Sequence, residues 1–63
     1  MEPFYSFDTM KYLLENRVVS VFYAQKGNLL VIAKFDEKKK EVEYFPSKSE
    51  KFLRKGIWYI LVD

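Results

Sequence analysis

The side chains best suited to bind a charged ligand form a basic stripe near the carboxyl end of this 63-residue chain. Three lysines recur at intervals of three and four residues, with an arginine on their flank: Lys48, Lys51, Lys55 and Arg54. At this spacing the lysines share one side of an α-helix. Such cations can contact phosphates, with an affinity that depends strongly on salt and little on base sequence. The stripe predicts a DNA- or RNA-binding surface, the alternative being a solvated helix face that maintains solubility.

The distribution of charge singles out the same stripe. The chain has a formal net charge of +2, and residues 44–56 alone sum to +3. The other lysine run, residues 38–40, is different, because residues 34–43 hold four lysines and four carboxylates and are neutral together. We interpret that run as a solvated turn.

The chemistry of most enzymes is excluded by composition. The chain has no histidine, no cysteine and no glycine-rich phosphate loop, so the usual general bases, thiol nucleophiles and zinc sites cannot be built. Two carboxylate pairs remain, Asp36 with Glu37 and Glu41 with Glu43, but lysines surround them on segments expected to be exposed. We therefore expect a non-enzymatic protein without metal, cofactor or small-molecule substrate; a carboxylate-based enzyme is the third hypothesis.

The amino-terminal part predicts one short helix. In SFDTMKYLLENR, Ser6 or Asp8 can cap the helix, and apolar residues recur at helical spacing on one side. Asn16 stands where such a helix would end, because asparagine tolerates the left-handed conformation found at helix ends.

Three strand-like segments follow this helix. The runs 17–25 and 28–36 are rich in Val, Ile, Phe and Tyr and flank Lys26-Gly27, which predicts a hairpin with Ala24 opposite Leu29. The segment EVEYF alternates glutamate with apolar residues, as a half-exposed third strand should.

The carboxyl-terminal part predicts a second helix and a last strand. Ser47-x-x-Glu50 is a capping-box pattern and Gly56 can end the helix, which places it at about residues 47–55. The apolar run IWYILV is then a buried strand. The predicted fold is a single α+β domain over residues 1–63, with a mainly antiparallel four-stranded sheet and two short helices in the order α-β-β-β-α-β.

The apolar surface of this sheet exceeds what its helices can cover. Two short helices can cover one face of four strands, yet both faces of the predicted hairpin are apolar. The uncovered face predicts a homodimer or a protein partner, with four anchors: Tyr23, Leu30, Ile32 and Tyr59. A protein–protein adaptor or inhibitor is thus the alternative to a nucleic-acid-binding regulator. A small curled β-barrel with peripheral helices is the alternative fold.

The remaining expectations concern the setting of the protein. The start, MEPFYSFDTM, lacks the pattern of a secretory signal, and no apolar run is long enough to span a membrane, so we expect an intracellular, cytoplasmic protein. The abundance of Lys and Glu, with no Cys or His, suggests a thermophilic source.

Overall fold

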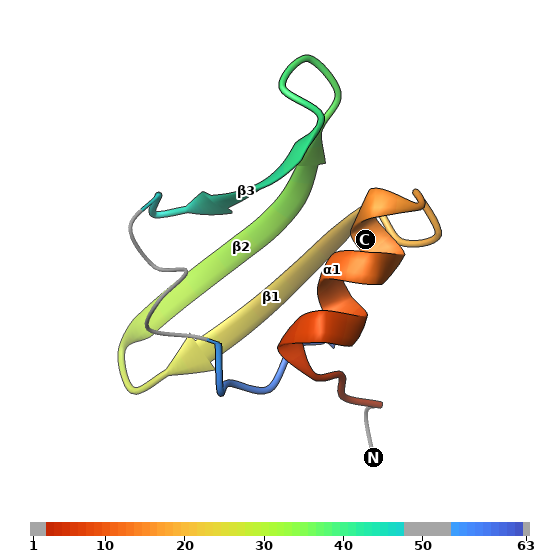
Figure 1. Ribbon diagram of the computed structural model, residues 1–63. Coiled ribbons are helices and arrows are strands. Elements are labelled where there is room, and N and C mark those ends of the chain that lie inside the picture. Colours follow the sequence, from red (N-terminus) through yellow and green to blue (C-terminus); the bar gives the residue numbers. More distant parts are fainter. Residues whose placement is uncertain (1–2, 48–53, 63) are drawn as a thin grey trace.

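The computed structural model describes residues 3–47 and 54–62 as one helix and one open four-stranded sheet (Figure 1). The sheet order is β3-β2-β1-β4, and every pair of neighbours is antiparallel. The predicted α+β class and antiparallel sheet are confirmed. The sheet does not close, so the barrel alternative is wrong. The elements of the described residues are α1 (Phe7–Glu15), β1 (Val21–Lys26), β2 (Leu29–Asp36), β3 (Glu41–Phe45) and β4 (Tyr59–Ile60).

The helix α1 has a cap at its amino end that its sequence predicts, but the left-handed conformation predicted for Asn16 is wrong. Ser6 is the N-cap, and its Oγ accepts a hydrogen bond of 3.2 Å from the Thr9 amide. At the other end the C-cap is Asn16, but the left-handed residue is Arg17, with φ of 57°. The amides of Arg17 and Val18 donate to the carbonyls of Leu14 and Leu13, which is the Schellman arrangement.

Arg17 fastens the end of α1 to the turn between β2 and β3. Its guanidinium donates two hydrogen bonds of 2.8 Å to the carboxylate of Glu37, lies 3.9 Å from the centre of the Phe35 ring, and also donates to the Glu15 carbonyl. The hydrogen bonds from Arg17 lower the pKa of Glu37. A bidentate pair and a stacked ring favour Arg17 at a position that usually takes glycine.

This pair predicts a small loss of stability in acid. Because Glu37 has a lower pKa in the folded chain than in the unfolded one, its contribution is full above the ordinary carboxyl pKa of about 4.5 and is lost as pH falls through the lower folded value. We expect Glu37→Gln to lower the thermal midpoint near neutral pH by a few degrees at most. The difference from the parent should vanish in strong acid. Glu41→Gln, which removes an exposed carboxylate of β3, is the matched control, and an equal effect of both variants would contradict the prediction.

The register of the β1–β2 hairpin is shifted by two residues from the predicted register. Lys26 pairs with Leu29, so the loop is Gly27-Asn28, and Ala24 pairs with Val31 rather than with Leu29. Gly27 has φ of 60°, which a two-residue hairpin loop of type II′ requires at its first central position. The prediction that Lys26 lies in the loop was wrong for this reason. A shift of two residues keeps every side chain on its predicted face.

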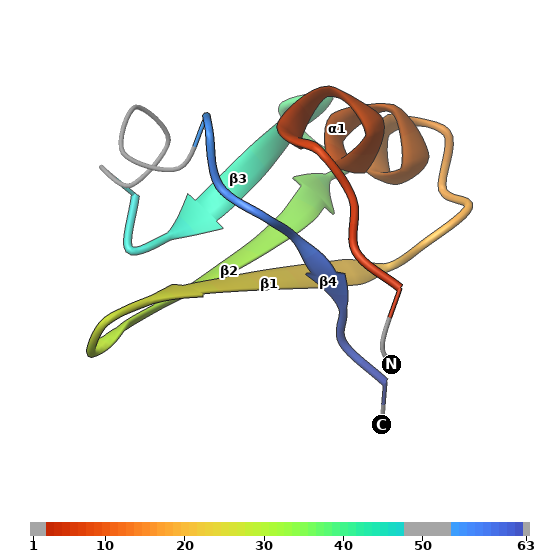
Figure 2. The same ribbon diagram turned by 90° about the horizontal axis from the view of Figure 1, so that it is seen from below.

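The core lies between α1 and one face of the sheet (Figure 2), and an aromatic group is part of it. The Trp58 side chain is fully buried, and the rings of Phe7 and Tyr44 lie 6.4 and 6.1 Å from it. Tyr5 joins this group because its backbone pairs with Trp58 through hydrogen bonds of 2.8 and 2.9 Å. Buried residues of α1 and the sheet complete the core: Met10, Leu14, Phe22, Ala24, Val31 and Ala33.

Several predicted boundaries at the strands and the carboxyl end differ from the structure. β1 begins at Val21 rather than at residue 17, because the chain first has to leave the helix through Arg17. β4 covers only Tyr59–Ile60 of the predicted strand 57–62. The predicted helix at 47–55 falls largely on residues 48–53, outside the described residues, while Arg54 and Lys55 lie in a turn.

The described part of the chain contains no helix long and apolar enough to cross a membrane.

Candidate docking surface

A row of large apolar side chains crosses the sheet on the face away from α1. In the strand register, Tyr59 of β4 lies beside Tyr23 of β1, which pairs with Ile32 of β2, which pairs with Phe45 of β3. Paired residues of antiparallel strands point to the same face. We call these four residues the apolar row, and the sheet face that carries them the outer face.

The outer face has no cover from the described chain. Figure 2 shows α1 on one side of the sheet, and no other described helix or strand lies against the opposite side. Adjacent residues of β2 show the contrast: Val31 is fully buried, whereas Leu30 is 51% exposed. Phe45 at the β3 end of the row is 46% exposed. The outer face is therefore an apolar surface open to solvent.

A hollow lies on the outer face beside Tyr23. It has a volume of about 410 Å³ and is lined by apolar and aromatic side chains: Tyr23, Leu30, Ile32, Ile60, Leu61 and Val62. The Tyr23 ring stacks on the Tyr59 ring, with centroids 5.4 Å apart, and this contact holds Tyr23 in place beside the hollow. The hollow can receive an apolar side chain of another molecule.

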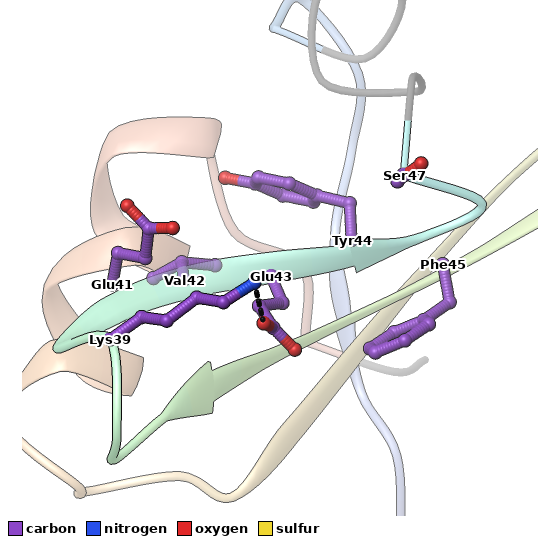
Figure 3. A pocket seen from close by; sticks show the side chains of 7 residues that line it. All are labelled: Lys39, Glu41, Val42, Glu43, Tyr44, Phe45 and Ser47. Atoms are coloured by element: carbon purple, nitrogen blue, oxygen red, sulfur yellow. Dashed lines mark ion pairs between the residues drawn. The ribbon is translucent and has the colours of Figure 1, made fainter.

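Among the described residues, the charged side chains of the outer face lie at one end of it. Lys34 pairs across the strands with Glu43, and the Lys39 ammonium lies 3.4 Å from the Glu43 carboxylate (Figure 3). At the end of β2, a hydrogen bond with Glu43 and a second one donated by the Lys38 amide lower the pKa of Asp36. These charges neutralise one another within the chain and border the apolar row without interrupting it.

The same end of the sheet has a polar hollow of about 350 Å³ beside β3, which Figure 3 shows. Its carboxylates come from Glu41 and Glu43, and Lys39 lies among them. Among the described residues no group of three or more potential metal ligands occurs. The hollow is a solvated edge of the sheet.

The structure brings the four predicted interface residues together. Tyr23, Ile32 and Tyr59 belong to the apolar row, and Leu30 lines the adjoining hollow. Sequence reasoning missed Phe45, Leu61 and Val62. The alternation in EVEYF does contain the signal for Phe45, because it shares a face with Glu41 and Glu43, but the two glutamates suggested a wholly polar face. Leu61 and Val62 were assigned to a buried strand that ends earlier.

Of the four predicted nucleic-acid-binding residues, two belong to the described part of the chain. Lys48 and Lys51 lie outside the described residues. Arg54 and Lys55 are exposed in a turn, and Lys55 lines a hollow of about 330 Å³ together with Lys26. The nucleic-acid hypothesis therefore stays a prediction from the sequence.

Comparison of the chain with protein-family models, with curated proteins and with solved structures finds no match in any of the three.

Proposed function

We propose that this chain is a non-enzymatic protein–protein interaction module that docks through its outer face. The observation that carries the proposal is the apolar row, four large side chains in register across four strands with no described element over them. Soluble monomers rarely expose a continuous apolar patch of more than a few hundred Å², and such patches commonly mark interfaces.

The composition of the outer face also suits recognition. Aromatic residues carry much of the binding energy at protein interfaces, and they do so best when they are held rigid beside a pocket. Tyr23 and Tyr59 stack on each other, and the hollow of about 410 Å³ adjoins them. A partner that buries this face gains a large contact area and loses little side-chain entropy.

A photoreactive side chain placed on the outer face tests the proposal. With benzoylphenylalanine in place of Leu30, we expect cross-linked adducts in the cells that produce the protein, because position 30 is half exposed beside the hollow. The adducts should fall at least about tenfold when Ile32→Glu is added, since an unpaired carboxylate in the interface opposes docking. The mass of each adduct, measured by mass spectrometry, identifies what is bound.

Benzoylphenylalanine in place of Tyr12, which is 63% exposed on α1, is the matched control. Equal adducts at positions 12 and 30, or adducts at position 30 that survive Ile32→Glu, would contradict docking through the outer face. Adducts to nucleic acid instead of protein at position 30 would also overturn it. Binding that weakens steeply with salt and is lost when Lys48, Lys51, Arg54 and Lys55 are neutralised would support the nucleic-acid hypothesis.

A further inference from the structure

The outer face carries both a projecting ring and a hollow, which lie toward opposite edges of the sheet. Phe45 lies on β3, at one edge, and its ring is 46% exposed. The hollow of about 410 Å³ lies toward the other edge, where Ile60, Leu61 and Val62 contribute to its lining. In Figure 3 the side chain of Phe45 points to the opposite side of β3 from Tyr44, which belongs to the core. The ring is thus free to enter a hollow of another molecule.

We propose that the occupant of the outer face is a second copy of this chain, packed face to face about a twofold axis parallel to the strands; this inference rests on the proposed function. Such an axis places β3 of one copy over β4 of the other, because these strands are the two edges of the sheet. Phe45 then meets the Tyr23 and Tyr59 rings and the hollow of the other copy. A twofold interface is self-complementary, so each copy supplies one ring and one hollow.

The charges of the outer face are compatible with this packing. Lys34 has Glu43 as its cross-strand neighbour, and its ammonium lies 5.1 Å from the centre of the Phe45 ring. Glu43 is also 3.4 Å from the Lys39 ammonium. Because Lys34 lies beside Glu43 and Glu43 pairs with Lys39 within the same copy, two facing copies can bury the apolar row without bringing a block of like charge together.

The area of the outer face suits a weak dimer. The strands β1 to β4 hold six, eight, five and two residues, and at about 4.8 Å per strand and about 3.3 Å per residue their outer face covers about 330 Å² per copy. Two copies would then bury about 670 Å², which is below the size of a stable specific interface and in the range of weak, transient contacts. A dimer of this size should be reversible and dependent on concentration.

The mass in solution tests this packing. We expect the mass of the full chain, measured by sedimentation at increasing concentration, to rise from 7.6 kDa toward twice that value. Phe45→Ser should raise the dimer dissociation constant at least about tenfold, because it removes the ring that fills the hollow. Tyr12→Ser, which removes an even more exposed ring from α1, should leave the dissociation constant unchanged.

Chemical cross-linking tests the orientation of the two copies. The Leu61 amide donates a hydrogen bond to the Val21 carbonyl. Val21 pairs with Lys34 of β2, and Lys34 pairs with Glu43 of β3. Glu43 and Leu61 thus lie level with each other at opposite edges, about 14 Å apart within one copy and about 10 Å apart between copies. In this cysteine-free chain, Glu43→Cys with Leu61→Cys should give a covalent dimer with a bis-maleimide that spans about 10 Å. Tyr12→Cys with Leu61→Cys should not.

The outcomes separate this inference from the proposed function. A mass of 7.6 kDa at every concentration would overturn the dimer, while adducts at position 30 to a different protein would still support docking through the outer face. A dimer that is indifferent to Phe45→Ser, or one that the control pair cross-links equally well, would overturn the face-to-face packing itself.

Discussion

Trp58→Ala is expected to remove a large part of the free energy of unfolding of this domain. The side chain is fully buried, and it contacts the rings of Phe7 and Tyr44. Loss of a buried aromatic residue costs about 3–5 kcal/mol. A chain of 63 residues has a total free energy of unfolding of only about 3–9 kcal/mol. The substitution therefore removes at least about a third of the stability of the domain, and all of it at the lower end of this range.

The reason for so large an effect is the position of Trp58 in the chain. Its backbone exchanges two hydrogen bonds with Tyr5, and its side chain packs against α1 and β3. It thus joins the amino-terminal segment, the helix and the edge of the sheet, which have few other links. Below about 70 residues, with no disulfide, a core of this kind has little reserve.

Urea unfolding followed by circular dichroism measures the loss. Trp58→Phe should retain part of the stability, because a ring remains and because the buried Trp58 Nε1, which has no acceptor among the described residues, is removed. Ile57→Ala is the matched control, since Ile57 is the preceding residue and is 50% exposed. A Trp58→Ala variant as stable as the Ile57→Ala variant would show that this core assignment is wrong.

The sequence predicts the elements well where local rules decide them. The helix α1 follows from Ser6 as a cap and from apolar residues at helical spacing, and β3 follows from the alternation in EVEYF. Four of the outer-face residues were also predicted, because the period of two fixes the face of every residue once a strand is located.

The features that the sequence did not predict depend on tertiary contacts. Arg17 takes a left-handed conformation because Glu37 and Phe35, twenty and eighteen positions away, hold its guanidinium. No local propensity could indicate that pair. The hairpin register depends on whether Gly27 is the first or the second residue of the loop. The predicted loop, Lys26-Gly27, and the observed loop, Gly27-Asn28, both contain this glycine.

The sequence also did not predict which face of the sheet is buried, for a different reason. Val31 and Ala33 on one face and Leu30 and Ile32 on the other are all apolar, so burial cannot be inferred from residue type. The small side chains of Ala24 and Ala33, both buried, mark the inner face, since they let the helix approach the strands closely. Side-chain size is thus a better guide here than hydropathy.

Two adjacent substitutions in β2 test this assignment of faces. Val31→Glu should abolish folding, because the position is fully buried in the core and a carboxylate has no counter-ion there. Burial of an unpaired charge costs several kcal/mol, which is comparable with the whole stability of the domain. Leu30→Glu, one residue away, should change the free energy of unfolding by less than about 1 kcal/mol, because the side chain is half exposed on the outer face.

Circular dichroism and amide proton spectra of the two variants decide between the faces. If both variants unfold, the outer face is covered by the chain itself, and neither docking nor dimerisation through it is possible. If both stay folded, Val31 is not part of the core. Folding of Leu30→Glu alone requires that the apolar side chain at position 30 of the outer face be dispensable for the stability of one copy, and an apolar surface that a protein does not need for folding is best explained by what it binds.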